Sequence, residues 1–400
     1  MARQIQEAYI VAATRTPVGK APRGMLRHVR PDDMLVHVIK SALAQVPAIG
    51  PAQIEDVIIG CAFPEAEQGL NMARIAALLA GLPDTVPGLT INRYCSSGLN
   101  ALQIAADRIR IGEADVVIAG GSESMSMVPM MGNKVALNPE IFAKDENYAI
   151  AYGMGITAEK VAQQWQVARA DQDAFALESH RRALAAAQSG AFDAEISPLE
   201  VTYRAPDLKC CEVRYSQKML RQDEGPRSDT SLEALGKLRT VFDAKGTVTA
   251  GNSSQTSDGA AAVLLVSEAA LKRHGLTPLA RYVTFAVKGV PPQIMGLGPK
   301  VAIPAALERA GIARDELRWI ELNEAFAAQA LAVIRDLGLD PQRVNPHGGA
   351  IALGHPLGAT GAIRTATLVH GMRGQGLKGY GMVTMCIGTG MGAAGILEVL

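Results

Sequence analysis

The sequence predicts an α/β protein made of two related halves with an inserted loop domain between them. Short, wholly apolar runs alternate with amphipathic stretches, which is typical of a sheet covered by helices on both faces. The alternation stops near residue 122 and returns near residue 251. Strand–turn–helix patterns of the first half then recur after residue 277, which indicates an internal duplication.

The composition excludes several classes of protein. A chain of 400 residues with 48% hydrophobic residues can bury a large core and is long enough for two or three domains. Lys plus Arg equals Asp plus Glu at 39 each, so bulk charge does not favour a nucleic acid or a membrane surface as partner.

The cysteines and the N-terminus indicate a cytoplasmic protein. The five cysteines have neither a metal-ligand spacing nor the pattern of a disulfide framework, and an odd number fits a reducing compartment. We expect no metal site. Met1 to Glu7 has no apolar segment of a signal peptide, and no run reaches membrane-spanning length.

The first half, residues 1–121 plus 251–276, alternates strands with helices. We expect strands at residues 8–13, 56–60, 85–91, 261–266 and 114–119, the last ended by Gly120-Gly121, and helices at 34–44, 71–80, 268–274 and from Ser96 onward. Residues 122–250 form the expected insertion. It begins with a methionine-rich stretch and has helices at 157–166 and 171–188, whereas 204–245 is dense in charges and shows no regular pattern.

The second half, residues 277–400, again alternates strands with helices. Strands are expected at residues 281–288, 317–322, 380–385 and 394–399, with another ending at Val344-Asn345, and helices at 301–310, 324–337 and 358–372.

Cys95 stands where an apolar strand ends and a helix begins. Backbone N–H groups at the start of a helix have no partner within it, so a thiolate at Cys95 is favoured by these donors and by the helix dipole. A single cysteine is more often a small buried apolar residue, so Cys95 alone leaves both interpretations open.

Three stretches of the second half lie at the ends of expected strands. Asn323 precedes a helix and reads equally well as an N-cap. His355 is fixed between Gly354 and Pro356, and Cys386 ends a strand before a glycine-rich turn whose N–H groups can approach a ligand. Together with Cys95, these residues offer a nucleophile, a base, a second acid–base group and an oxyanion pocket.

The combination resembles the thiolase family along essentially the whole chain. The matching motifs are Asn92-Arg93-Tyr94-Cys95-Ser96-Ser97-Gly98, Thr247 to Ser254 with Asp258 to Ala261, Ile294 to Pro299, Asn323-Glu324-Ala325-Phe326, Gly348 to Pro356 and Cys386-Ile387-Gly388-Thr389-Gly390. The resemblance implies a thiolase-like fold, with mixed sheets packed in layers. It also implies a homodimer or homotetramer.

The resemblance also implies a mechanism. His355 takes the proton of Cys95, which attacks a 3-oxoacyl-CoA; Cys386 protonates the departing acetyl-CoA, and a second CoA collects the acyl group from Cys95. The N–H groups of Cys95 and Gly388 hold one oxyanion, and His355 with a water fixed by Asn323 holds the other.

The resemblance implies that the insertion, residues 122–250, binds CoA. The implied CoA contacts are Arg227, Phe242 and Met154 within it and Ser254, Met295 and Phe326 outside it. Arg227 also reads as a solvated charge in a charge-dense segment. CoA is a substrate here, and no cofactor is implied.

Gly153 bears on the subfamily. Biosynthetic acetoacetyl-CoA thiolases usually have a histidine at the position of Gly153, so this chain resembles a degradative 3-ketoacyl-CoA thiolase. A biosynthetic thiolase and a non-catalytic acyl-CoA- or lipid-binding protein of the same fold stay as alternatives. The related ketoacyl and hydroxymethylglutaryl synthases lack a second cysteine in a Cys-x-Gly-x-Gly turn, so Cys386 argues against them.

Overall fold

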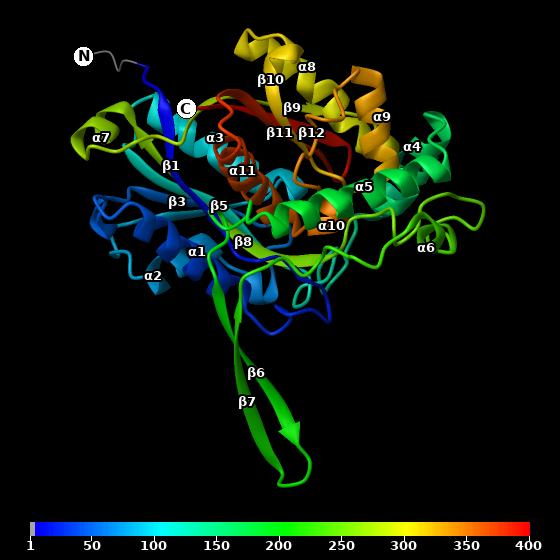
Figure 1. Cartoon of the computed structure of the whole chain (residues 1–400), viewed down its shortest axis with the longest axis horizontal. Coiled ribbons are helices and arrows are strands. Elements are labelled where there is room, and N and C mark those ends of the chain that lie inside the picture. The colour runs from blue at the N-terminus through cyan, green and yellow to red at the C-terminus, as the bar shows by residue number, and fades with distance from the viewer. Residues whose placement is uncertain (1–4) are drawn as a thin grey trace.

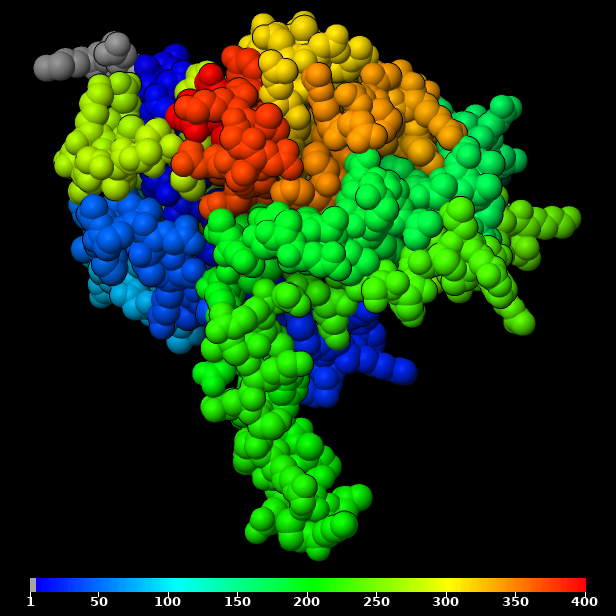
Figure 2. All heavy atoms as spheres, in the orientation of Figure 1, coloured from blue at the N-terminus to red at the C-terminus, as the bar shows by residue number. Residues whose placement is uncertain are grey.

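A mixed sheet of ten strands runs through the computed structural model (Figure 1), which describes residues 5–400. Its order is β10-β11-β12-β9-β1-β8-β5-β3-β4, and the short β2 pairs with β8. A separate hairpin, β6–β7, projects from the body of the molecule (Figures 1 and 2). The expectation about the extreme N-terminus falls partly on residues 1–4, outside the described residues.

Nine of the twelve strands among residues 5–400 lie at the predicted apolar runs, whereas β2, β6 and β7 were not predicted. The strands are β1 Ala8–Arg15, β2 Gly19–Lys20, β3 Asp56–Gly60, β4 Gly88–Ile91, β5 Val116–Ser124, β6 Leu199–Asp207, β7 Glu212–Leu220, β8 Ser257–Ser267, β9 Ala280–Gly289, β10 Leu317–Leu322, β11 Gly379–Ile387 and β12 Met391–Val399.

The helices lie near the amphipathic stretches. They are α1 Pro31–Gln45, α2 Met72–Leu79, α3 Ser97–Arg110, α4 Met154–Gln164, α5 Arg169–Gln188, α6 Leu232–Gly236, α7 Glu268–Arg273, α8 Gly298–Ala310, α9 Ala327–Leu337, α10 Ala350–Leu353 and α11 Leu357–Gly374. Among residues 5–400, no helix has both the length and the apolar character needed to span a membrane.

The two halves meet in the middle of this sheet. Strand β1 pairs with β8 on one side and with β9 on the other, through Tyr9–Arg281 and Ile10–Ala280. Strand β8 lies between β1 and β5, so it is hydrogen-bonded to strands from residues 1–121. The α/β architecture is confirmed, whereas the domain boundaries at 121, 250 and 276 stay a prediction.

Helices α3 and α11 form the central layer. They pack on one face of the sheet with inward side chains of strands from both halves, such as Val117 and Val383. The opposite face is covered by α1 and α2 in the first half and by α8 and α9 in the second. The site residues Cys95 and His355 precede the first turns of α3 and α11, so this central layer positions both.

Glycines allow α3 and α11 to approach each other closely. A Cβ added at Gly361 would lie 2.3 Å from the Leu99 nitrogen, and one at Gly98 would lie 2.8 Å from the Gly358 oxygen. Atoms this close cannot be accommodated without moving one backbone.

Three local predictions are wrong. Gly120-Gly121 does not end β5, which continues to Ser124. A Cβ at Gly121 would lie 2.3 Å from the Gly358 oxygen, so the glycine is needed for α11 to pack closely on this strand. Val344 forms one isolated bridge with Ile320 and not a strand. Within the charge-dense segment, β6 and β7 form a regular hairpin, and β7 is exposed over nearly its whole length, so it lacks the buried face that produces apolar alternation.

Candidate active site

Cys95 lies in a tight turn between β4 and α3. The single turn of 3₁₀ helix Tyr94–Ser96 leads into α3, and Tyr94 has a positive φ of 45°. The Ser97 hydroxyl braces this turn by accepting from the Arg93 N–H at 2.8 Å and donating to the Tyr94 oxygen at 2.7 Å. The predicted strand–turn–helix placement of Cys95 is confirmed, and the strained Tyr94 backbone is the feature expected of a functional turn.

The sequence analysis expects N–H donors to favour a thiolate at Cys95, and burial opposes them in the folded chain. The backbone N–H groups of Gly388 and Cys95 donate to the sulfur and lower the pKa of Cys95, as expected. Burial outweighs them and raises this pKa to about 12. Cys95 therefore carries a neutral thiol beside two oriented N–H donors.

His355 is held from both sides of its ring. Its Nδ1 lies 2.7 Å from the Thr360 hydroxyl, and its Nε2 accepts from the Asn323 amide nitrogen at 3.3 Å. Since Nε2 accepts, the ring proton of a neutral imidazole lies on Nδ1, and Nε2 holds the free electron pair. Burial and then the charge of Arg364 lower the pKa of His355 to about 3, so the imidazole is neutral.

The backbone before His355 is equally constrained. Gly354 has a φ of 91°, and a Cβ there would lie 2.4 Å from the Ser257 hydroxyl. The His355 N–H donates to the Gln255 oxygen at 3.2 Å and to the Ser257 hydroxyl at 3.1 Å. The glycine-bracketed histidine of the sequence is therefore fixed by its chain as well as by its ring.

Asn323 is not an N-cap. Helix α9 has its N-cap at Phe326, and the Asn323 side chain instead turns toward His355. Its Oδ1 is buried and has no hydrogen-bond partner among residues 5–400. A buried amide oxygen without a partner is costly, and a water molecule that accompanies substrate can satisfy it.

Cys386 lies near the end of β11, in an apolar cluster with Met295 and Phe326, against which Met154 packs. Burial, and then the neighbouring Cys95, raise the pKa of Cys386 well above its ordinary value. The two thiols, one from each half, are thus neighbours in a buried site. Gly388 follows the strand, and a Cβ there would lie 3.6 Å from the Tyr94 ring.

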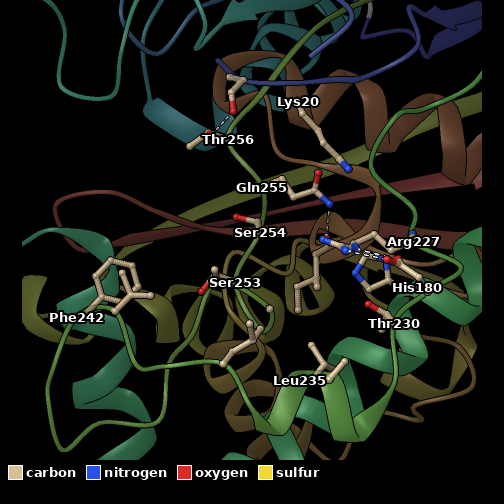
Figure 3. Close-up of a pocket in the computed structure, with 18 residues that line it drawn as sticks. Lys20, His180, Arg227, Thr230, Leu235, Phe242, Ser253, Ser254, Gln255 and Thr256 are labelled. Carbon is tan, nitrogen blue, oxygen red and sulfur yellow. Dashed lines mark hydrogen bonds and ion pairs between the residues drawn. The ribbon is translucent and has the colours of Figure 1, made fainter. Parts of the chain in front are cut away.

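A cavity of about 610 Å³ lies beside these residues (Figure 3). Its wall includes three residues predicted to contact CoA: Arg227, Phe242 and Ser254. Lys20 and His180 also line it and were not predicted, since neither falls in a recognised motif.

The segment Ser253–Thr256 connects the cavity to the catalytic residues. Its side chains line the cavity, while its backbone bonds to Ala325 and Phe326 next to the Cys386 cluster and to His355. Phe242 and Phe326 are in edge contact with centroids 6.1 Å apart. Residues 253–256 thus separate a ligand in the cavity from the catalytic groups.

Glu123 joins the two halves behind the site. Its buried carboxylate accepts from the backbone N–H of Ala62 at 2.7 Å and of Gly358 at 2.9 Å, and burial raises its pKa. Because Gly358 is in the first turn of α11, this carboxylate fixes that helix to the first half. Glu123 was not predicted as a site residue, because it fell at the edge of the predicted insertion.

Metal ligation finds no support in the side chains. Within the part of the chain that the structure describes, no three His, Cys, Asp or Glu residues are grouped to hold a metal ion.

Known proteins match this chain along its whole length. The family model "Thiolase, N-terminal domain" matches residues 8–269 and "Thiolase, C-terminal domain" matches residues 276–399. A 3-ketoacyl-CoA thiolase of Bacillus subtilis is 52% identical over 397 residues, covering 99% of this chain and 100% of that protein.

Solved structures agree with this match. The crystal structure of the Bacillus anthracis acetyl-CoA acetyltransferase has a TM-score of 0.89 at 38% identity and covers 100% of both chains. Human mitochondrial 3-ketoacyl-CoA thiolase has a TM-score of 0.88 at 39% identity and covers 99% of both chains.

Proposed function

Because the chain belongs to the thiolase family and is an acetyl-CoA acyltransferase, we propose that it cleaves 3-oxoacyl-CoA through an acyl thioester on Cys95. The observation that carries this proposal is the pair of buried, neighbouring thiols together with a neutral imidazole that is bonded to Asn323, whose backbone N–H donates to Thr384, two residues before Cys386 in β11. A protein that only binds acyl-CoA has no use for this arrangement.

In the first step, the Cys95 proton moves to His355 Nε2 as the sulfur attacks the 3-keto carbon. The carbon–carbon bond then breaks, and the acetyl-CoA carbanion takes its proton from Cys386, leaving a thiolate there. In the second step, Cys386 accepts the thiol proton of a new CoA, whose sulfur attacks the thioester. Cys95 leaves as a thiolate and recovers its proton from His355, so both steps balance.

Two oxyanion sites support this route. The N–H groups of Cys95 and Gly388 both face the Cys95 sulfur, so they are close to the position of an acyl carbonyl bonded to that sulfur. The unpaired Oδ1 of Asn323 beside His355 suits a water that would complete the other site. Removing one such donor costs roughly 100- to 1000-fold in rate.

Proton transfer must accompany the attack. Burial raises the pKa of Cys95 to about 12 and lowers that of His355 to about 3, so both groups are neutral near pH 7. We propose a neutral resting pair that ionises only as the new carbon–sulfur bond forms.

We propose a degradative role with room for longer acyl chains. A Cβ added at Gly153 would meet nothing within 4 Å, so the space beside Met154 is open. Rates measured on 3-oxoacyl-CoA substrates of graded length test this, and strict preference for acetoacetyl-CoA would favour the biosynthetic alternative.

We also propose that the protein is a homodimer or homotetramer. Strand β4 is an unpaired edge of the sheet, and exposed strand edges favour pairing with another chain. Several large apolar side chains of the segment 125–156 are exposed, namely Met130, Met131, Val135, Leu137, Phe142, Tyr148, Ile150 and Ile156. Light scattering that shows only a monomer would refute this.

The free state of all five cysteines suits a reducing compartment, so we propose a cytoplasmic enzyme. We propose no resident cofactor, since side chains supply the nucleophile and both acid–base groups and CoA acts as substrate.

The mechanism is tested by separating the two thiols. Cys386→Ala should still acquire an acyl group on Cys95 from a reactive thioester, detected by mass spectrometry, but should fail to cleave acetoacetyl-CoA. Cys386→Ser is the matched control for volume. Normal cleavage by Cys386→Ala would refute the role of Cys386, and the absence of any adduct on wild-type Cys95 would favour the binding-protein alternative.

A further inference from the structure

One end of the cavity is cationic, and its residues come from three separate parts of the chain. Lys20 belongs to β2, His180 to α5, and Arg227 to the segment before α6. Figure 3 shows these three side chains on one side of the cavity and Phe242 on the other. The cavity thus has a cationic end and an apolar end.

Lys20 is available to a ligand. Its backbone N–H donates to Glu224 at 2.8 Å, which fixes the chain at this point. Its ammonium group has no hydrogen-bond or ion-pair partner within residues 5–400 and lies at the cavity wall. A lysine ammonium without a carboxylate partner in a cavity wall is suited to an anionic ligand.

His180 is a fixed neutral donor. Its ring is 5% exposed, and its Nδ1 accepts from the Arg227 backbone N–H at 3.2 Å, so the proton of the neutral ring lies on Nε2. Burial, followed by the charges of Arg227 and Lys20, lowers the pKa of His180 to about 4. The ring therefore donates from Nε2 at neutral pH and sits within the field of both cations.

Arg227 is only loosely engaged. Its guanidinium binds Asp229 at 3.2 Å and 3.0 Å, and the two side chains are 56% and 72% exposed. Ion pairs this exposed are weak, so the guanidinium can turn to a stronger anion. Two cations face one carboxylate at this end, which leaves a net positive charge.

We propose that Lys20 and His180 join Arg227 to bind a phosphate group of CoA. The inference rests on the proposed function, since it takes the cavity to hold CoA with its pantetheine arm along the apolar end toward Phe326. The phosphate bound is either the 5′-diphosphate or the 3′-phosphate of the nucleotide, and the chemistry of the site is the same for both.

The experiment compares Lys20→Met with Lys40→Met, a change at an exposed lysine of α1 that does not line the cavity. For acetoacetyl-CoA, Lys20→Met should raise KM about 10-fold, the effect of losing one charge-assisted contact, with kcat retained. For the N-acetylcysteamine thioester of acetoacetate, which has no phosphate, KM should be the same as in the wild type. His180→Ala should raise KM for the CoA substrate, and His180→Gln, which places an N–H near the position of Nε2, should restore it.

Dephospho-CoA distinguishes the two sources of phosphate. If the 3′-phosphate is bound, Lys20→Met should not raise KM for dephospho-CoA thioesters. If the diphosphate is bound, Lys20→Met should raise KM for these substrates as it does for CoA thioesters. An equal KM change on the phosphate-free thioester, or none on any substrate, would overturn the inference. Wild-type protein that turns over no acyl thioester would instead refute the proposed function.

Discussion

The hydroxyl of Thr360 should decide whether His355 can act as a base. Thr360 Oγ1 lies 2.7 Å from His355 Nδ1 and is buried within α11. In Thr360→Val, a side chain of nearly the same shape leaves the Nδ1–H group without an acceptor. An unsatisfied buried donor costs about 1–3 kcal/mol in unfolding free energy.

The imidazole can avoid this cost by moving its proton to Nε2, where it would block acceptance of the Cys95 proton. Loss of a general base lowers rates roughly 100- to 10,000-fold. We therefore expect kcat for thiolysis of acetoacetyl-CoA to fall at least 100-fold, in an assay that monitors the decrease in the enolate absorbance of this substrate. Denaturant unfolding measures the accompanying loss of stability.

Two controls make the result specific. Thr360→Ser keeps the hydroxyl and should retain activity. Thr365→Val removes a buried hydroxyl of the same helix that bonds only to the Gly361 carbonyl, so it should leave the rate unchanged. If Thr360→Val turns over like the wild type, then Thr360 does not set the tautomer of His355.

Further outcomes follow from the same geometry. Because the pKa of His355 is about 3 and that of Cys95 about 12, both groups stay neutral from roughly pH 5 to 9. The rate of Cys95 acylation should therefore be nearly independent of pH in this range. An inflection of this rate near the ordinary histidine pKa would contradict the neutral pair. The depressed pKa of His355 should also lower the free energy of unfolding as pH falls from about 6.5 toward 3, since the unfolded chain binds a proton that the folded one excludes; His355→Gln should flatten this dependence in denaturant titrations. Gly121→Ala should cost about 1–3 kcal/mol by pressing on the Gly358 oxygen 2.3 Å away, while Gly374→Ala, where a Cβ meets nothing within 4 Å, should not; equal melting temperatures would refute the close approach of β5 and α11.

The sequence predicts the parts of this protein in which local pattern and burial coincide. Strand β3 and the turn before α3 lie where apolar periodicity places them, because a strand buried on both faces leaves a continuous apolar run. The exposed hairpin β6–β7 leaves no such trace. Nor could the pattern predict that β5 continues through Gly120-Gly121, since the reason lies in α11, more than two hundred residues later.

The site residues also separate into those that the local sequence predicts and those that it does not. Turn chemistry singles out Cys95 and His355 in advance, because glycine and proline next to a reactive side chain are visible in sequence. The sequence indicates the N–H donors that lower the pKa of Cys95, because these are local, but it does not show the burial that outweighs them, because burial depends on the whole fold. Lys20 and His180 had no signal of their own, because only the folded chain brings them to one cavity.

The placement of β12 has a consequence for synthesis on the ribosome. This strand comprises Met391–Val399, the last strand of the chain, yet it lies in the interior of the sheet between β11 and β9. Strand β11, which carries Cys386, has no antiparallel partner until those final residues have emerged from the exit tunnel. A nascent chain arrested before Met391 would therefore expose two unpaired strand edges, one on β11 and one on β9, and exposed edges favour pairing with other chains.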